Sequence, residues 1–503
     1  MGTDRWVGTA VVTAVVVGVL LRIWFISSAL GPFDSDEAVA GLMGRHMLDG
    51  EFFSFYWGQA YGGVHEAVLL TVLFAVRTPA WLAMEIVPMA LSGVAALLTW
   101  RIGLLTFGRA GAALAGSLFW CSSAVFVWQS TKERSFYAAT LVAGTAVLFL
   151  TLRLIERPTR RDALLLGVAG GVGWHSSPNI VYMAAPALLW LLIETVRKRD
   201  LTVLRMSWVA AVGAVVGALP WIYSNLASGG ASLKVGEVLD TTYAFRLGAF
   251  AKRALPYALG AQTPQWEITL PSKILYAFLL AGLALAVLRL PRKAYVFVLG
   301  LAMLPFIFAA LPTSWYVREP RYLYFTWPLV VLVVGGALGT LRNHSLALGV
   351  LVLIAAGSVA STAVMVERGE SVKGLWDFAP GDLSPVIARL DAEGQDRVFA
   401  DYWIAYRLAL ATDEKVIAAP LQMIRYEPYE AEVRAAENPT YVFFDGSCDE
   451  EKFTAFLDGR GVAYTDNTAG IFAVVQPASR VLPEEALVEW AVAARRLARG
   501  NVC

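Results

Sequence analysis

The sequence predicts a polytopic α-helical membrane protein with a small extracytoplasmic α/β domain at its C-terminal end. Of its 503 residues, 57% are hydrophobic and only 16% are charged, whereas a soluble chain is about one quarter charged. Apolar windows of roughly 20 residues, enough to cross a bilayer, recur up to residue 366. Residues 367–503 then hold 23 acidic and 14 basic residues, against 17 and 27 in the preceding part. We therefore expect a membrane domain over 1–366 and a soluble domain over 367–503.

About eleven membrane spans are expected in the first part of the chain. Their positions are 7–28, 80–106, 110–128, 136–155, 162–175, 178–195, 207–226, 272–290, 295–311, 322–341 and 345–366. One set of connecting loops is rich in Lys and Arg, which places these loops in the cytoplasm. The alternate loops and the acidic tail should then lie outside; these loops are 29–79, 129–135, 175–178, 227–271 and 312–321. This distribution predicts a multi-pass protein of the cell membrane.

The first external loop, 29–79, should contain juxtamembrane helices. Its apolar run 65–76 is too short to cross a bilayer comfortably, so we expect an interfacial or half-inserted helix there. If this run crossed the membrane fully, the predicted orientation of the later loops and of the tail would reverse.

The tail should alternate short strands with helices. Strand-like apolar runs lie at 397–402, 440–445 and 470–475, and helix-like stretches lie at 385–393, 427–436, 450–459 and 483–499. The tail carries no recognisable catalytic motif, so we expect it to dock or to position an acceptor. Cys448 and Cys503 could pair if the tail lies outside the cytoplasm.

The first external loop carries the strongest candidates for chemistry. Asp34, Asp36 and Glu37 place three carboxylates within four positions after the first span. Like charges raise one another's pKa unless a cation, a metal or a substrate offsets them. In a purely structural alternative, Asp34 and Ser35 cap a helix, and Asp36 and Glu37 are favourable charges in its first turn.

Several cations lie on the outward side, where the positive-inside rule leaves few. They fall in two short segments that also contain aromatic residues, and these are Lys132, Arg134 and Tyr137 in the first and Arg318, Arg321 and Tyr322 in the second. An anionic partner explains cations in such positions, and a lipid headgroup is the alternative.

Three further features lie at the same level of the predicted membrane. Arg22 falls within the first span, where a cation at the helix centre costs roughly 2.5–3.5 kcal/mol unless it snorkels outward or pairs with a lipid phosphate. The aromatic run 52–61, which includes Tyr61, is either an interfacial belt or a wall for sugar stacking. His175 is more typical of a structural histidine than of a ligand.

These residue types together indicate a reaction class. A carboxylate can take a proton from an acceptor hydroxyl, while Arg and Lys stabilise a departing phosphate. The sequence contains neither a P-loop nor a dinucleotide fingerprint. No stripe of Lys and Arg remains once the membrane-flanking charges are set aside, which argues against nucleic-acid binding. Transfer of a group from a lipid-linked phosphate fits this arrangement.

Four features of the chain recur together in one group of membrane enzymes. They are the order of the spans, the motif Asp36-Glu37-Ala38 after the first span, the polar turn 132–137, and the element Arg321-Tyr322 followed by Pro328. In these features the sequence resembles the GT-C superfamily of membrane glycosyltransferases, in its protein O-mannosyltransferase-like branch (glycosyltransferase family 39). The resemblance implies a GT-C fold, a polyprenyl-phosphate-linked sugar donor and an inverting single displacement. The acceptor would be an extracytoplasmic protein, glycan or lipid. The high content of Ala, Val, Gly, Leu and Arg indicates a GC-rich bacterial source.

The resemblance also implies roles for individual residues. Asp36 would be the general base, Glu37 an orienting or metal-contacting neighbour, and Arg321 a ligand of the donor phosphate. Further candidates for the phosphate are Arg318, Lys132, Arg134 and Arg22. The candidates for substrate binding are Asp34, Tyr61, Glu66, Tyr137, His175 and Tyr322.

The chain departs from the family pattern at one point. Many relatives have Lys-Pro-Pro where this sequence has Gly63-Val64-His65-Glu66, which leaves the role of Glu66 open. Metal use varies within the superfamily, so a divalent cation held by Asp36, Glu37 and Glu66 is compatible with the resemblance but not implied by it. No other cofactor is expected.

Three other functions are compatible with a polytopic chain. A transporter or flippase of lipid-linked oligosaccharides predicts functional charges near the middle of the membrane and related halves of the chain. A receptor or assembly scaffold would only display the acidic tail. An O-antigen ligase or polymerase is the nearest enzymatic alternative, but its external loop is centred on Arg and His, whereas the loop here begins with acids.

Overall fold

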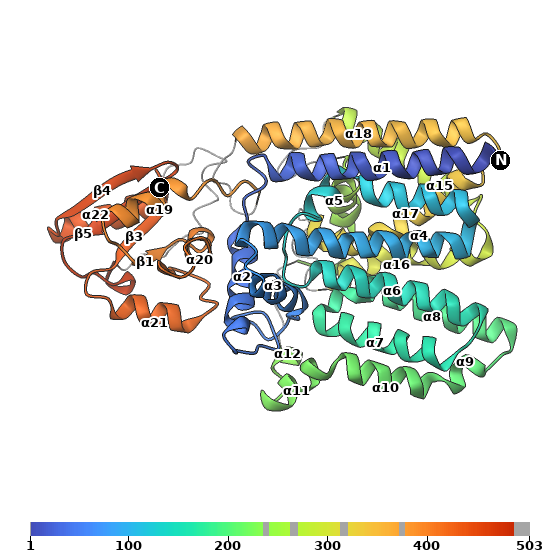
Figure 1. The fold of residues 1–503 in the computed structure, drawn as a ribbon, viewed down its shortest axis with the longest axis horizontal. Coiled ribbons are helices and arrows are strands. Elements are labelled where there is room, and N and C mark those ends of the chain that lie inside the picture. Colours follow the sequence, from blue (N-terminus) through green and yellow to red (C-terminus); the bar gives the residue numbers. More distant parts are fainter. Residues whose placement is uncertain (1, 235–240, 262–269, 312–319, 372–377, 487–503) are drawn as a thin grey trace.

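A long helical bundle accounts for most of the chain. The computed structural model describes residues 2–234, 241–261, 270–311, 320–371 and 378–486. The helices of the bundle and its loops are α1 (Gly2–Ile26), α2 (Ser35–Leu48), α3 (His65–Ala75), α4 (Ala80–Cys121), α5 (Ala124–Gln129), α6 (Tyr137–Glu156), α7 (Arg160–Ser176), η1 (Pro178–Ile180), α8 (Val181–Lys198), α9 (Thr202–Arg205), α10 (Ser207–Gly217), α11 (Leu219–Ala227), α12 (Ala231–Lys234), α13 (Tyr243–Ala249), η2 (Phe250–Ala254), α14 (Leu255–Ala258), α15 (Leu270–Val287), η3 (Arg292–Ala294), α16 (Tyr295–Ala310), η5 (Pro320–Thr326), α17 (Trp327–Gly339) and α18 (His344–Ser371). In Figure 1 the long helices run side by side, and the N terminus lies at the end of the bundle far from the C-terminal domain.

Many of these helices are long and apolar enough to cross a bilayer. The described part of the chain contains seven such helices, or eight if α10 and α11, which meet at a bend of 63°, form one span. The expected spans 162–175 and 272–290 coincide with α7 and α15. The chain is therefore a multi-pass membrane protein, as predicted. Helix α3 has 11 residues, a length of about 16 Å, which is too short to cross a hydrocarbon core of about 30 Å.

Helix α4 is a hairpin of two helical arms. Its backbone leaves the helical conformation at Gly108, where φ is 77°, a value that glycine adopts without steric cost. A Cβ atom added at Gly103 would lie 2.6 Å from the Cα of Ala112, although nine residues of continuous helix would separate the two positions by about 13 Å. The two arms therefore lie against each other and correspond to the separate spans expected at 80–106 and 110–128.

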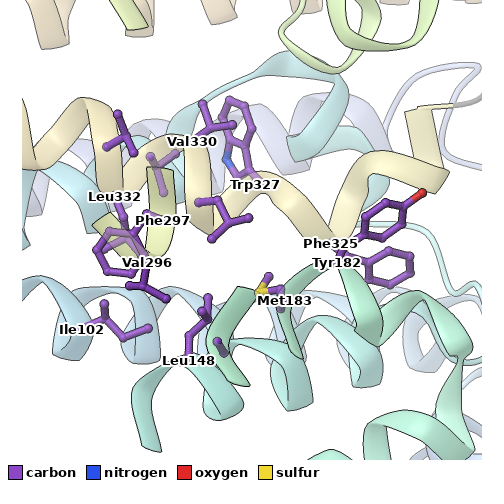
Figure 2. Close-up of a cluster of buried hydrophobic side chains, with 14 of the residues drawn as sticks. Ile102, Leu148, Tyr182, Met183, Val296, Phe297, Phe325, Trp327, Val330 and Leu332 are labelled. Atoms are coloured by element: carbon purple, nitrogen blue, oxygen red, sulfur yellow. The ribbon is translucent and has the colours of Figure 1, made fainter. Parts of the chain in front are cut away.

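The core of the bundle is apolar and drawn from many helices. Figure 2 shows Ile102 of α4, Leu148 of α6, Met183 of α8, Phe297 of α16 and Val330 of α17 in one cluster of buried side chains. Packing among side chains from such distant parts of the sequence holds the helix ends that lie nearest the C-terminal domain in fixed relative positions. The loops that carry the candidate site are attached to these ends.

The C-terminal domain is a five-stranded sheet with helices. Its elements are α19 (Ser384–Ala392), β1 (Arg397–Ala400), α20 (Tyr402–Ala411), β2 (Ile417–Pro420), α21 (Glu427–Ala435), β3 (Thr440–Phe444), α22 (Cys448–Arg460), β4 (Tyr464–Ala469), β5 (Phe472–Pro477) and η6 (Pro483–Ala486). The strand order is β2-β1-β3-β5-β4. Strands β2, β1 and β3 are parallel, whereas β5 and β4 pair in antiparallel fashion.

Three of the five strands of this domain were predicted from the sequence, and β2 and β4 were not. The predicted strands at 397–402, 440–445 and 470–475 correspond to β1, β3 and β5, and the predicted helices at 385–393, 427–436 and 450–459 correspond to α19, α21 and α22. The sequence gives weak signals for β2, which has four residues, and for β4, which is mostly polar. Only the start of the predicted helix 483–499 is described, as η6, and Cys503 lies outside the described residues.

Helix α20 attaches this domain to the loop region 29–79. Arg407, which is 2% exposed, donates hydrogen bonds to the carbonyl oxygens of Phe33 (2.9 Å), Pro380 (2.8 Å) and Gly381 (2.5 Å). A buried guanidinium that satisfies three carbonyl groups is costly to remove, since each of them would lose its partner. The tail therefore packs directly on the loop that contains the predicted carboxylates.

A second attachment involves a histidine between two carboxylates. His46, in the last turn of α2, places Nδ1 3.0 Å from Oε1 of Glu51 and Nε2 3.0 Å from Oε1 of Glu414 in the C-terminal domain. The ring of Trp57 stacks on Tyr426 at 4.1 Å beside it. Although burial alone would lower the pKa of His46, its hydrogen bonds and its attraction to both carboxylates raise that pKa above the usual value.

The docking of the C-terminal domain should weaken as the pH rises. The stability that protonated His46 contributes is fully present below its unfolded pKa of about 6.5 and is lost as the pH rises through the higher folded pKa. We expect the melting temperature of the wild type to fall by a few degrees from pH 6 to pH 8.5, and the His46→Gln variant to lack this component. The control is His344→Gln at the other end of the bundle, which should behave like the wild type. Equal pH dependence of the wild type and His46→Gln would contradict the assignment.

Candidate active site

A capping box at the start of α2 fixes two of the three predicted carboxylates, Asp34 and Glu37. The Asp34 side chain accepts a hydrogen bond from the backbone N–H of Glu37 (3.0 Å), and Glu37 Oε1 accepts one from the backbone N–H of Asp34 (3.1 Å). Each side chain thereby satisfies a backbone donor that the helix leaves open. Asp34 therefore caps the helix, as the structural alternative predicted. Asp36 takes no part in this capping box.

Two buried ion pairs fasten this helix start to the turn 131–136. Arg134 Nη1 lies 2.5 Å from Oδ2 of Asp34, and Lys132 Nζ lies 3.4 Å from Oε1 of Glu37. Glu37 Oε2 also accepts a hydrogen bond from the backbone N–H of Glu133 (3.0 Å). The predicted carboxylates and cations are thus close together. However, Asp34 and Glu37 form ion pairs with Arg134 and Lys132, and these pairs join the start of α2 to the turn 131–136.

Asp36 is the carboxylate that faces other functional groups. Its side chain is 24% exposed, and Oδ2 lies 3.4 Å from Nη1 of Arg321. The hydroxyl of Tyr402 donates a hydrogen bond of 2.5 Å to Oδ1, and the hydroxyl of Tyr56 donates one of 2.9 Å to the backbone carbonyl. Burial by itself would raise the pKa of Asp36, but the guanidinium groups of Arg321 and Arg425 and the Tyr402 hydroxyl hold it below its usual value. Asp36 is therefore ionised at neutral pH.

A cavity opens in front of Asp36. Its volume is about 270 Å³, and its walls come from the first loop, the turn before α6, the starts of η1 and η5, and the C-terminal domain. Its lining includes Asp36, Tyr56, Gln59, Tyr61, Arg134, Tyr137, Asn179, Arg321, Tyr322 and Arg425. Guanidinium groups from three separate segments therefore surround one carboxylate, next to a wall of tyrosines. This combination suits a ligand that joins a phosphate to a sugar.

Two residues of the C-terminal domain belong to this site. Tyr402 follows β1 and Arg425 follows β2, so both leave the carboxyl edge of the parallel part of the sheet. Arg425 Nη1 donates to Oε1 of Gln59 (3.3 Å), and its Nε donates to the Tyr402 hydroxyl (3.4 Å). Burial and the nearby Asp36 carboxylate raise the pKa of Tyr402 well above its usual value, so its hydroxyl remains a proton donor. Sites of α/β sheets form at this edge, which is the signal that could have identified both residues.

The fold has known relatives among membrane glycosyltransferases. Residues 67–223 match the family model described as dolichyl-phosphate-mannose-protein mannosyltransferase, and no curated protein matches the sequence. The structure is similar to that of ArnT from Cupriavidus metallidurans in the apo state, with a TM-score of 0.63 at 14% identity over 95% of this chain and 98% of that one. The same protein bound to undecaprenyl phosphate gives a TM-score of 0.59 at 15% identity, over 94% and 98% of the two chains.

A third solved structure resembles the chain more distantly. The archaeal oligosaccharyltransferase AglB from Archaeoglobus fulgidus, in complex with an inhibitory peptide and a dolichol-phosphate, gives a TM-score of 0.51 at 13% identity, over 95% of this chain and 74% of that one. The chain has the GT-C fold. The fold that the sequence resemblance implies is thereby confirmed. The family match begins after Asp36 and ends before Arg321, so the roles of these residues depend on the geometry of the site.

Within this GT-C fold, several predicted site residues lie away from the cavity. Lys132 Nζ donates to the carbonyl oxygens of Gly31 (3.1 Å) and Pro32 (2.8 Å) in addition to its contact with Glu37. Lys132 is therefore a structural cation, and its predicted role as a phosphate ligand is not supported by its position. The carboxylate of Glu37 likewise points at backbone N–H groups and Lys132, which fits an orienting role for Glu37 but no contact with substrate. Asp34 is also buried, and its carboxylate caps α2 and pairs with Arg134.

Arg22 and His175 have structural surroundings in this fold. Arg22 Nη1 donates to the carbonyl oxygens of Gly18 (2.8 Å) and Trp120 (2.9 Å), and its guanidinium stacks on the Trp120 ring at 3.8 Å. Packing within the bundle therefore accommodates this cation, and Arg22 does not line the cavity. The Nε2 atom of His175 lies 2.7 Å from the carbonyl oxygen of Ser54, as expected of a structural histidine. Arg318 lies outside the described residues.

Glu66 belongs to a separate pair of buried acids. Its Oε1 accepts a hydrogen bond from the backbone N–H of Ala139 (2.9 Å), and burial raises the pKa of Glu66 to about 7. Burial and the neighbouring Glu66 carboxyl raise the pKa of Glu133 well above its usual value. Two carboxyl groups in such a site share a proton, and the pair supports the turn that carries Arg134. Glu66 does not line the cavity.

The three carboxylates considered for a metal do not converge. Asp36 contacts Arg321 and Tyr402, Glu37 contacts Lys132, and Glu66 contacts the backbone of α6. Across the described residues, no group of three His, Cys, Asp or Glu side chains is arranged to hold a metal ion. The predicted donor set therefore does not fit a divalent cation in this structure.

Proposed function

We propose that the protein is an inverting glycosyltransferase that transfers one sugar from a polyprenyl-phosphate-linked donor to an acceptor hydroxyl outside the cytoplasm. The observation that carries this proposal is the ionised carboxylate of Asp36 facing Arg134, Arg321 and Arg425 in one cavity. The complexes of ArnT with undecaprenyl phosphate and of AglB with dolichol-phosphate support the class of donor. The sugar is a hexose or a pentose, and the acceptor is a protein, a glycan or a lipid.

The guanidinium groups have the role of holding the phosphate. Phosphate oxygens accept charge-assisted hydrogen bonds from arginine, which is well suited to binding them in pairs. Arg321 reaches the cavity from η5, Arg134 from the turn before α6, and Arg425 from the C-terminal domain. A donor phosphate held among them would place the anomeric carbon in front of Asp36. The same groups stabilise the charge that grows on the phosphate as it departs.

Donor binding would also activate the base. In the structure, Arg321 and Tyr402 stabilise the ionised form of Asp36 and so reduce its basicity. A phosphate competes with the carboxylate for Arg321 and adds negative charge nearby, and both effects raise the pKa of Asp36. The base therefore becomes stronger only when a donor is in place.

The reaction is a single displacement, in which one bond forms at the anomeric carbon as another breaks. Asp36 takes the proton of the acceptor hydroxyl, and the acceptor oxygen forms a bond to the anomeric carbon from the face opposite the phosphate. The bond between that carbon and the phosphate oxygen breaks, and its electron pair leaves with the polyprenyl phosphate. Attack from the opposite face inverts the anomeric centre. The phosphate is a competent leaving group, so no strong general acid is needed.

The experiment that tests this proposal uses the full chain in phospholipid nanodiscs. We expect it to release polyprenyl phosphate from polyprenyl-phosphate sugars when an acceptor is supplied, and lipid mass spectrometry of the purified protein to detect a polyprenyl phosphate or its sugar ester. Failure to turn over any donor of a panel of hexosyl and pentosyl polyprenyl phosphates, together with the absence of such a lipid, would contradict the proposal.

Tyr402→Phe should separate a role in catalysis from a role in folding. The hydroxyl of Tyr402 lowers the pKa of Asp36, so its removal should move the acidic limb of the kcat/KM profile to higher pH. Above this limb we expect transfer at least as fast as in the wild type, because Asp36 becomes the stronger base, with little change in donor affinity. The control is Tyr464→Phe, on strand β4. An unchanged pH profile of Tyr402→Phe would contradict the assignment.

A further inference from the structure

A second cavity lies at the end of the bundle far from Asp36. It has a volume of about 280 Å³ and is formed by the first arm of α4, the last turns of α6 and α8, and η3. In Figure 1 this end is marked by α9 and by the N terminus, opposite the C-terminal domain. Its loops are the ones whose Lys and Arg content predicts the cytoplasmic side.

The cavity combines cations with an apolar wall. Its charged residues are Glu156, Glu194, Arg197, Lys198, Arg292 and Lys293, and its apolar residues are Leu105, Leu152, Ile155 and Trp190. Four cations against two carboxylates leave an excess of two positive charges. A cavity of this composition at the membrane boundary matches the basic pockets between helices that bind phospholipid headgroups.

Glu194 and Glu156 pair with the cations of the cavity but do not use all of their N–H donors. Glu194, whose side chain is 5% exposed, accepts hydrogen bonds from Arg197 through Oε2 (2.6 and 3.0 Å) and from Arg292 Nε through Oε1 (3.0 Å). Lys293 pairs with Glu156. The Arg292 bond uses one of the five N–H groups of its guanidinium. The buried carboxylate of Glu194 thereby holds the remaining N–H groups of Arg292 next to the cavity.

A hydroxyl inside the cavity has no partner of its own. The Oγ1 atom of Thr106 is buried and makes no hydrogen bond to any described residue, and Thr106 lines the cavity. A buried polar atom without a partner is costly, which points to a polar ligand at this position. We propose that the cavity binds the headgroup of an anionic phospholipid of the cytoplasmic leaflet, with the phosphate on Arg292, Arg197 and Lys293 and an acyl chain along Trp190.

The surrounding surface favours a lipid over a soluble anion. Leu189 and Ile193 of α8 are more than one third exposed and lie on the same side of that helix as Arg197, which lines the cavity, since the three positions are spaced four residues apart. An acyl chain can continue from the cavity along this side, whereas a soluble anion would gain nothing from it. This inference does not depend on the proposed transferase activity.

The test compares lipids on the full chain in nanodiscs. With phosphatidylglycerol in place of phosphatidylcholine, we expect a higher melting temperature, and native mass spectrometry should show one retained phosphatidylglycerol. The double variant Arg292→Gln/Lys293→Gln should bind it at least tenfold more weakly. The matched control is Arg160→Gln/Arg161→Gln, an adjacent exposed pair at the start of α7, at the same end of the bundle, which should bind like the wild type.

A second variant keeps the test decisive if the first does not fold. Lys198 is exposed and donates only to the carbonyl oxygen of Ile155 among the described residues, so Lys198→Gln removes a charge while keeping a donor there. It should weaken phosphatidylglycerol binding several-fold. Binding equal to wild type in the double variant, or in Lys198→Gln where the double variant does not fold, would overturn the proposal. A stabilisation by inorganic phosphate alone as large as that by phosphatidylglycerol would overturn it as well, because the site would then take a soluble anion.

Discussion

Asp36→Asn should abolish sugar transfer without weakening donor binding. A general base contributes about 10²- to 10⁴-fold to a rate, and asparagine cannot accept the proton of the acceptor hydroxyl. Because the Asp36 carboxylate lies 3.4 Å from Arg321, its removal frees Arg321 for the phosphate, and donor affinity should be unchanged or higher. Initial rates with a radiolabelled polyprenyl-phosphate sugar, and equilibrium binding of polyprenyl phosphate, measure the two effects.

The control for this variant lies on the same helix segment. Asp49 caps the other end of α2 and is exposed, so Asp49→Asn changes the same charge without reaching the cavity. It should transfer sugar like the wild type. Turnover of Asp36→Asn within a few-fold of the wild type would show that another group takes the proton.

Arg321→Ala should weaken donor binding and also slow the transfer. A hydrogen bond to a charged group is worth about 1.5–3 kcal/mol, so we expect a loss of about 10- to 150-fold in affinity for polyprenyl phosphate. The guanidinium of Arg321 lowers the pKa of Asp36, so the acidic limb of the kcat/KM profile should move to higher pH. Arg321→Lys keeps the charge but not the paired donors, and it should give intermediate values.

The matched control for this variant flanks the same helix. Arg321 precedes α17, and Arg342, which is exposed, follows it. Arg342→Ala should leave donor affinity and turnover unchanged. If Arg321→Ala binds polyprenyl phosphate as tightly as the wild type does, the phosphate contacts other groups.

The membrane part of the fold was predictable because its signal is local. An apolar window of sufficient length identifies a span without knowledge of its neighbours, and the break of α4 at Gly108 fell between two expected spans. Helix α20 was missed, although it carries Arg407 and Tyr402. Its run of ten residues is mostly apolar and directly follows the apolar strand β1, so the sequence alone does not separate the strand from the helix.

The candidate site was predictable only in part. Asp36 and Arg321 were singled out and lie 3.4 Å apart, and Arg134, Tyr61, Tyr137 and Tyr322 also line the cavity. The sequence could not show that Lys132 and Glu37 would neutralise one another, since charge pairing depends on distances that only the fold sets. The contributions of Tyr402 and Arg425 were missed because they come from a domain without a recognisable motif.

The bond between Tyr402 and Asp36 has a consequence for how the protein is made. These partners are 366 residues apart, and synthesis at about 5–20 residues per second separates their emergence from the ribosome by roughly 20–70 s. During that interval a nascent chain has inserted its first loop but lacks the tyrosine and the arginine that complete it. Under the proposed function, copies interrupted before residue 425, or clipped later within the tail, would therefore lie in the bilayer with an incomplete set of side chains around Asp36.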